Sequence, residues 1–130
     1  MLKKNYVRIQ VRYTGRTGKP CGVFAANWHL LNAGRFSSED KELFLKTEEW
    51  FRENLPVPPF YDKENPEKNN PQKAITWFKT GAIGKYEEQI IILTGLLEKH
   101  GVYYDIVYTD FVGEIIYEDD EQVAVIGRES

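Results

Sequence analysis

The stretch YVRIQVRY at residues 6–13 alternates apolar and polar side chains, and it decides how the chain begins to fold. The apolar and aromatic side chains recur at every second position: Val7, Ile9, Val11 and Tyr13. Arg8 and Arg12 lie on the opposite face, with Gln10 between them. A period of two over such a stretch is typical of a β-strand that buries one face. The pattern therefore predicts a half-buried first strand with a basic second face.

Three segments downstream have helical periodicity. Residues 21–32 repeat apolar side chains at spacings of three and four, and Gly34 follows as a residue that commonly ends helices. The second segment begins at Ser37 and Ser38, which are favourable N-cap residues, and it ends before Pro56. The third has the clearest pattern, with apolar side chains at Ile83, Tyr86, Ile90, Leu93 and Leu97.

Short apolar segments predict the remaining strands, at residues 74–79, 102–108, 115–117 and 122–126. The last two are expected to form a C-terminal β-hairpin. The order βααβαβββ predicts one α+β domain over residues 1–130, with a single mixed β-sheet and about three helices packed mainly on one face. The stretch from Trp77 to Tyr108 is expected to form a βαβ crossover. Residues 56–73 are rich in proline and asparagine and predict a partly mobile loop.

The composition is that of a folded domain. Of the 130 residues, 42% are hydrophobic and 14% are aromatic, which is too rich in core-forming side chains for a disordered chain. The longest apolar run, residues 90–93, is too short to span a bilayer, and no signal-peptide core follows the basic N-terminus. The single cysteine, Cys21, excludes an intrachain disulfide. We therefore expect a cytoplasmic protein without a membrane partner.

Charge is distributed unevenly along the chain. The formal net charge of −3 does not favour nucleic acid as a partner. Residues 1–20 nevertheless hold six Lys or Arg side chains and no acid, whereas residues 114–121 hold five acids and no base. These two segments either pair with each other within one sheet or face different partners.

The loop GRTGKP at residues 15–20 joins the first strand to the first helix and is a candidate anion site. Its glycines permit a close approach of the backbone, and Arg16 and Lys19 add positive charge near a helix N-terminus. It is not a nucleotide-binding P-loop, because the glycines are too close together and Pro20 follows the lysine. The alternative is a solvated basic turn.

Arg8 and Arg12 are the best candidates for a binding site, since a guanidinium group can hold a phosphate by two hydrogen bonds. The alternative is that both arginines form cross-strand pairs with the acidic hairpin. Trp77 and Lys79 extend the candidate site, because an exposed ring beside a lysine can stack on a nucleobase or an aromatic partner. Strand alternation places Trp77 opposite Phe78, and core packing of both rings is the alternative for this pair.

No catalytic motif is evident. Cys21 and His29 lie eight residues apart, but their spacing does not fix the geometry that a Cys–His nucleophile requires. No grouping of His, Cys, Asp or Glu has the spacing of a metal site. We therefore expect no metal, no cofactor and no enzymatic activity, although an enzyme with an unrecognised site is left open.

Three stretches resemble a family of small bacterial proteins to which no activity is attached. They are GRTGKPCGVFAA at residues 15–26, WFRENLP at 50–56 together with ITWFK at 75–79, and IYEDDEQVAV at 116–125. Because the family has no known activity, the resemblance implies no catalytic residue. It implies only that residues 62–72 are an insertion relative to the family's pattern.

Two functions follow from these observations. The first is non-enzymatic binding of a small anionic ligand, such as a nucleotide, by Arg8, Arg12, Arg16, Lys19, Trp77 and Lys79. The second is docking on another protein, as an interaction module or an inhibitor, through the aromatic surface and the acidic hairpin. Self-association into a homo-oligomer is left open.

Overall fold

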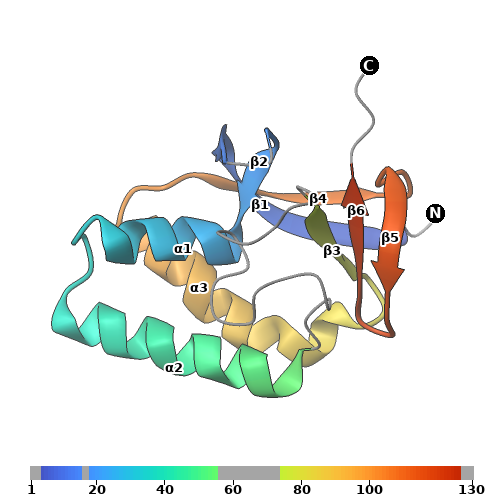
Figure 1. The fold of residues 1–130 in the computed structure, drawn as a ribbon. Coiled ribbons are helices and arrows are strands. Elements are labelled where there is room, and N and C mark those ends of the chain that lie inside the picture. The colour runs from blue at the N-terminus through green and yellow to red at the C-terminus, as the bar shows by residue number, and fades with distance from the viewer. Residues whose placement is uncertain (1–3, 16–17, 56–73, 127–130) are drawn as a thin grey trace.

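The structure of the chain is a computed structural model, and it describes residues 4–15, 18–55 and 74–126 (Figure 1). The elements run in the order β1 (Tyr6–Thr14), β2 (Pro20–Gly22), α1 (Val23–Asn32), α2 (Ser38–Asn54), β3 (Ile75–Lys79), the short 3₁₀ helix η1 (Ile83–Tyr86), α3 (Glu87–Lys99), β4 (Tyr104–Thr109), β5 (Glu114–Glu118) and β6 (Gln122–Ile126). Within these ranges six strands form one sheet, and the three α-helices lie on one side of it. The predicted α+β fold with a C-terminal hairpin is confirmed. The loop predicted at residues 56–73 lies outside the described residues.

Strand β1 organises the sheet because it pairs on both of its edges. On one edge it pairs with β4 over six residues, from Tyr6–Thr109 to Val11–Tyr104. On the other edge its first half pairs with β3 and its second half pairs with β2. The sheet therefore forks at this edge, and β6 and then β5 continue it beyond β3. In Figure 1 the β5–β6 hairpin runs steeply to β1 and β4, so the sheet is strongly twisted.

Every neighbouring pair of strands in the described sheet is antiparallel. Strands β3 and β4 are each antiparallel to β1, so they run parallel to each other with β1 between them. The expected crossover through α3 is therefore present, but it spans the width of one inserted strand. A mixed sheet would contain adjacent parallel strands. Strands β3 and β4 are parallel but are separated by β1, so the described sheet is antiparallel and not mixed.

Two apolar clusters cover the two faces of the sheet. The larger cluster lies between the sheet and the helices and contains Val7, Phe78 and Leu93. The smaller cluster lies on the opposite face, where Trp77 packs against Val123 and its neighbours. Successive residues of a strand point to opposite faces, which explains why adjacent rings enter different clusters. The predicted separation of Trp77 and Phe78 is confirmed, and both rings are buried. None of the described helices is long and apolar enough to cross a membrane.

The N-terminus of α2 is held by a capping box and by a charged cluster. The Ser37 hydroxyl accepts from the Asp40 backbone N–H at 3.1 Å, and the Asp40 carboxylate accepts in return from the Ser37 N–H. At the end of α3, Lys99 donates to Asp40 at 2.7 Å, and His100 Nε2 lies 3.0 Å from the same carboxylate. The hydrogen bond from Lys99, followed by those from His100 and Ser37, holds the pKa of Asp40 well below its ordinary value despite the opposing effect of burial.

Acid is expected to weaken the link that Asp40 makes between α2 and α3. Because the pKa of this carboxyl is lower in the folded chain, its stabilising effect is complete above the unfolded value of about 4 and is lost on acidification below it. Asp40→Asn should therefore lower the thermal midpoint clearly at about pH 5 and by a smaller amount at about pH 2.5, as the contribution of the carboxylate begins to be lost. Glu39→Gln, at an exposed acid in the same turn, is the matched control. A gap between wild type and Asp40→Asn that stays constant over this range would contradict the assignment.

Candidate functional site

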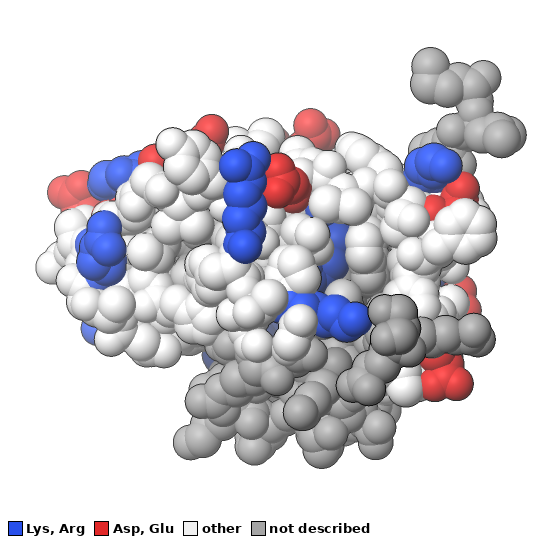
Figure 2. All heavy atoms as spheres, turned by 90° about the horizontal axis from the view of Figure 1, so that it is seen from above, with Lys and Arg blue, Asp and Glu red and all other residues white. Residues whose placement is uncertain are grey.

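Four of the described residues that were predicted to form an anion site lie on the face of the sheet turned away from the helices. Strand alternation and register place Arg8 and Arg12 of β1 on this face together with Trp77 and Lys79 of β3. Figure 2 looks onto this side of the molecule, and its basic side chains lie at separate places with acidic side chains beside several of them. Whether these residues act together therefore depends on the partners that each one has.

Arg8 closes the fork in the sheet. It is only 7% exposed. Its Nε donates to the Thr76 carbonyl of β3 at 3.1 Å, and its Nη1 donates to the Pro20 carbonyl of β2 and to Gln10 Oε1, both at 2.9 Å. A Cβ on Gly22 would lie 3.3 Å from Nη2, so the glycine leaves room for the guanidinium group. Arg8 thus holds together two strands that do not pair with each other.

Arg12 is exposed but has an acidic partner. Its guanidinium group forms an ion pair with Asp105 at 3.2 Å and lies 5.5 Å from the centre of the Tyr103 ring. The hydrogen bond to Asp105 raises the pKa of Arg12. Cross-strand pairing was the alternative for this residue, and the carboxylate comes from β4 and not from the C-terminal hairpin.

The basic loop is only partly described. Arg16 lies outside the described residues, so its predicted role stays a prediction. Lys19 is half-buried, and its carbonyl accepts from the Gly15 N–H at 3.0 Å across the turn that leads into β2. Gly18 adopts a φ of +76° in this turn, a conformation that L side chains rarely adopt. The turn brings the loop to the same end of the sheet as Arg8, whose Nη1 contacts Pro20.

Trp77 and Lys79 have different surroundings, one apolar and one charged. Trp77 is 8% exposed and packs in the smaller apolar cluster, and within the described part of the chain its indole N–H has no hydrogen-bond partner. Lys79 forms an ion pair with Glu118 of the hairpin at 2.6 Å, and this hydrogen bond raises the pKa of Lys79. The buried Trp77 ring does not offer an exposed platform for stacking, so core packing, its alternative role, describes its surroundings.

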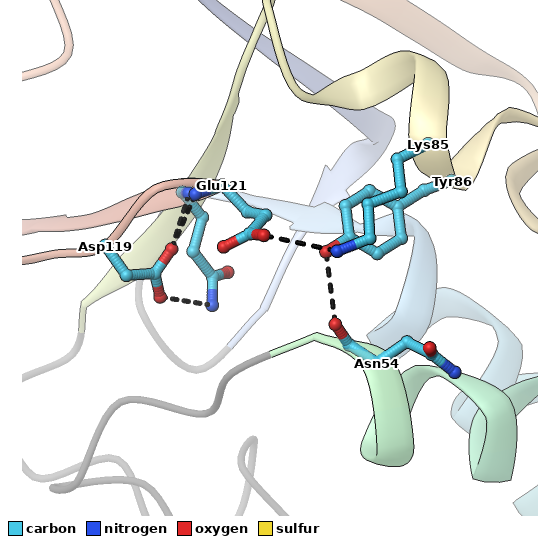
Figure 3. A network of polar contacts seen from close by, with 6 residues as sticks. Asn54, Lys85, Tyr86, Asp119 and Glu121 are labelled. Carbon is cyan, nitrogen blue, oxygen red and sulfur yellow. Dashed lines mark hydrogen bonds and ion pairs between the residues drawn. The ribbon is translucent and has the colours of Figure 1, made fainter.

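The acidic hairpin uses several of its carboxylates within the fold (Figure 3). Asp119 Oδ1 accepts from the backbone N–H groups of Glu121 and Gln122 and holds the turn between β5 and β6. Glu121 forms an ion pair with Lys85 at 3.3 Å, and the Tyr86 hydroxyl beside it donates to the Asn54 carbonyl of α2 at 3.2 Å. Burial, together with the charge of Glu121, raises the pKa of Tyr86. This network ties the hairpin to the helical layer, and it was not predicted because its residues are distant in sequence.

The sequence did not favour a Cys–His nucleophile formed by Cys21 and His29. Cys21 is buried in β2, and His29 Nδ1 lies 2.9 Å from the Tyr13 hydroxyl. Among the described residues, no three side chains of His, Cys, Asp or Glu gather closely enough to hold a metal ion.

The largest exposed apolar side chains gather along β4, at one edge of the sheet. Four of them form what we call the β4 surface: Tyr103, Ile106, Tyr108 and Phe111, which are 74%, 53%, 58% and 89% exposed. Among the described strands β4 pairs only with β1, so its outer edge has no neighbour. Ile106 and Tyr108 face the helical side of the sheet, as their partners Ile9 and Val7 do, but lie beyond the cover of the helices.

The geometry of the β4 surface is the strongest guide to function. No known protein family matches this chain. No curated protein and no solved structure matches it either. The function is therefore inferred from the side chains alone.

Proposed function

We propose that this chain is a non-enzymatic binding protein that docks on another polypeptide through the β4 surface. One observation supports the proposal most: three large rings and an isoleucine are exposed on or beside β4, whose outer edge has no partner among the described strands. Scattered apolar residues on a surface need no explanation, whereas several large ones beside one sheet edge are a candidate interaction site. An unpaired edge adds backbone donors and acceptors that an extended partner can bind.

Charged pairs border the β4 surface and leave its centre apolar. Arg12 and Asp105 pair on the face opposite Ile106 and Tyr108, where Arg12 also lies against the Tyr103 ring, and Lys4 Nζ lies 3.7 Å from the Asp110 carboxylate at the end of the strand. Within Tyr104–Thr109 the only charged residue is Asp105, and there is no proline or lysine. This arrangement resembles the apolar centre and polar rim of protein interfaces.

The opposite edge of the sheet lacks these properties. Strand β5 begins and ends with the acids Glu114 and Glu118, and its register shifts between Ile115 and Tyr117. Charges and bulges on an edge strand discourage pairing with another chain. Because β4 has neither a bulge nor an unpaired charge, it is the edge that favours a partner.

Site-specific photo-crosslinking in the protein's native cells tests this proposal. A photoreactive phenylalanine analogue at Phe111 is expected to crosslink to a polypeptide, because a bound strand would pass within reach of its ring. The same analogue at Ile91, which is 60% exposed on α3, is the matched control and should give little product. Equal crosslinking at both positions, or none at Phe111, would contradict the proposal.

Binding of a small anionic ligand remains a second candidate, and one observation favours it. Arg8 Nη2 lies against Gly22, the N-cap of α1, which has no side-chain cap and no acid in its first turn. A guanidinium group and a helix N-terminus both attract anions. Thermal-shift measurements with phosphate and nucleotides test this candidate, since a ligand at ~100 times its dissociation constant adds about 2.7 kcal/mol of stability. No shift with any of these anions would argue against it.

A further inference from the structure

We propose that the β4 surface binds β4 of a second copy of this chain, with the two strands antiparallel about a two-fold axis. This inference rests on the proposed function, because it names the partner of the same surface. It would extend the sheet across two protomers and pair the outer edge of each β4. Two-fold dimers are the commonest oligomers, and their interfaces use the same patch on both subunits.

The alternation along β4 makes its two faces self-complementary. When an antiparallel pair of identical strands is related by an axis perpendicular to the sheet, each residue faces one that points to the same side. The strands must then be centred on a single residue, and either Ile106 or Val107 lies near the middle of β4. In both registers the exposed side chains on the helical side of one copy meet those of the other.

The charge of Asp105 favours the register centred on Val107. With Ile106 at the centre, the two Asp105 side chains would be diagonal neighbours, roughly 7–8 Å apart. With Val107 at the centre, each Asp105 faces Thr109 of the second copy. The two Asp105 residues are then four positions apart, which is about 13 Å along the strand direction. That register also places Ile106 opposite Tyr108 of the second copy, and pairs of an aromatic with a β-branched side chain stabilise sheets.

The exposed area suffices for a small but specific dimer. Aromatic side chains bury about 150–250 Å² each, so the exposed parts of Tyr103, Tyr108 and Phe111 amount to roughly 330–550 Å² in each copy. Ile106 and the strand backbone add to this. Complete burial of these rings in two copies gives roughly 660–1,100 Å² before Ile106 and the backbone are added, near the lower limit for specific interfaces.

Sedimentation of the purified chain from micromolar to millimolar concentration tests the inference. We expect a reversible dimer of twice the 15.2 kDa chain mass. Ile106→Lys should raise its dissociation constant about tenfold or more, because a lysine at the centre of the pair must be desolvated. Ile91→Lys, an equivalent change at an exposed site on α3, should leave dimerisation unchanged. A monomer at every concentration, or a dimer that Ile106→Lys does not weaken, would overturn the inference.

Cysteine crosslinking tests the register. In a Cys21→Ala background, Val107→Cys should form an intermolecular disulfide readily, because directly opposed residues on paired strands lie within the Cα separation that a disulfide spans. Ile91→Cys should not form one. Efficient crosslinking through Ile106→Cys in place of Val107→Cys would overturn the Val107-centred register, and no crosslink at either position would overturn the paired strands.

These outcomes separate the inference from the proposed function. If the purified chain stays monomeric while Phe111 crosslinks to a different polypeptide in cells, the second copy is excluded and the β4 surface remains the docking site. If the chain is monomeric and Phe111 gives no crosslink above the Ile91 control, both are excluded.

Discussion

Replacing Arg8 by methionine should destabilise the fold by about 3 kcal/mol or more, although the variant retains most of the side-chain volume. The guanidinium group makes three hydrogen bonds to described residues, two of them to backbone carbonyls of β2 and β3. Its removal leaves the Thr76 and Pro20 carbonyls without this donor at a largely buried position, and each such group costs about 1–3 kcal/mol. Urea unfolding followed by tryptophan fluorescence measures this loss.

Arg12→Met is the matched control, because it removes the same group from the same face of β1. The Arg12 side chain is 66% exposed, and its ion pair with Asp105 is surrounded by solvent. Exposed ion pairs contribute little to stability, so the unfolding midpoint of this variant should stay close to that of the wild type. Equal losses in the two variants would show that Arg8 is not the residue that closes the fork.

Tyr86→Ala should cost about 3–5 kcal/mol, the range for removing a large buried aromatic side chain. Tyr86 has no exposed surface, and its ring lies 5.8 Å from that of Phe51 and 5.6 Å from that of Phe78. It therefore joins α2 to β3 at the point where the hairpin network meets the helices (Figure 3). Calorimetric unfolding measures the loss.

Tyr86→Phe separates the ring from the hydroxyl. It removes the hydroxyl, which donates to the Asn54 carbonyl and also interacts with Lys85, and one hydrogen bond contributes about 1 kcal/mol. A loss in Tyr86→Phe as large as that in Tyr86→Ala would assign the stability to the polar network and not to aromatic packing.

Local patterns in the sequence predicted most of the secondary structure. The alternation in residues 6–13 corresponds to β1, with Val7 and Ile9 in the larger core. The cap at Ser37 opens α2 as expected. These features depend on neighbouring residues, whose preferences are legible without the rest of the fold.

The burial of Arg8 could not be predicted in the same way. Arg8 and Arg12 occupy equivalent places in the alternation, yet one is buried and the other is exposed. The difference arises because β2 and β3 meet β1 along the same edge, which depends on residues far apart in the chain. The pairing of Lys79 with Glu118 was not predicted, because pairing with the hairpin was considered only for the basic residues of the N-terminal segment.

The β4 surface could not be predicted from the sequence for a related reason. Residues 102–108 have the apolar character of any strand, and burial of such a strand depends on its place in the sheet. Ile106 and Tyr108 are exposed because β4 is an edge strand that extends past the helices. Strand order is a property of the whole fold, so neither the edge nor its uncovered rings could be assigned locally.

Residue-resolved amide hydrogen exchange of the purified chain, in dilute and concentrated solution, tests most directly whether another strand completes the β4 edge. Alternate amides of Tyr104–Thr109 point away from β1, and pairing with a second copy predicts that these exchange much more slowly in the concentrated sample. The amides of β5 should exchange alike in both. Equal exchange of the outward β4 amides at the two concentrations would contradict the account.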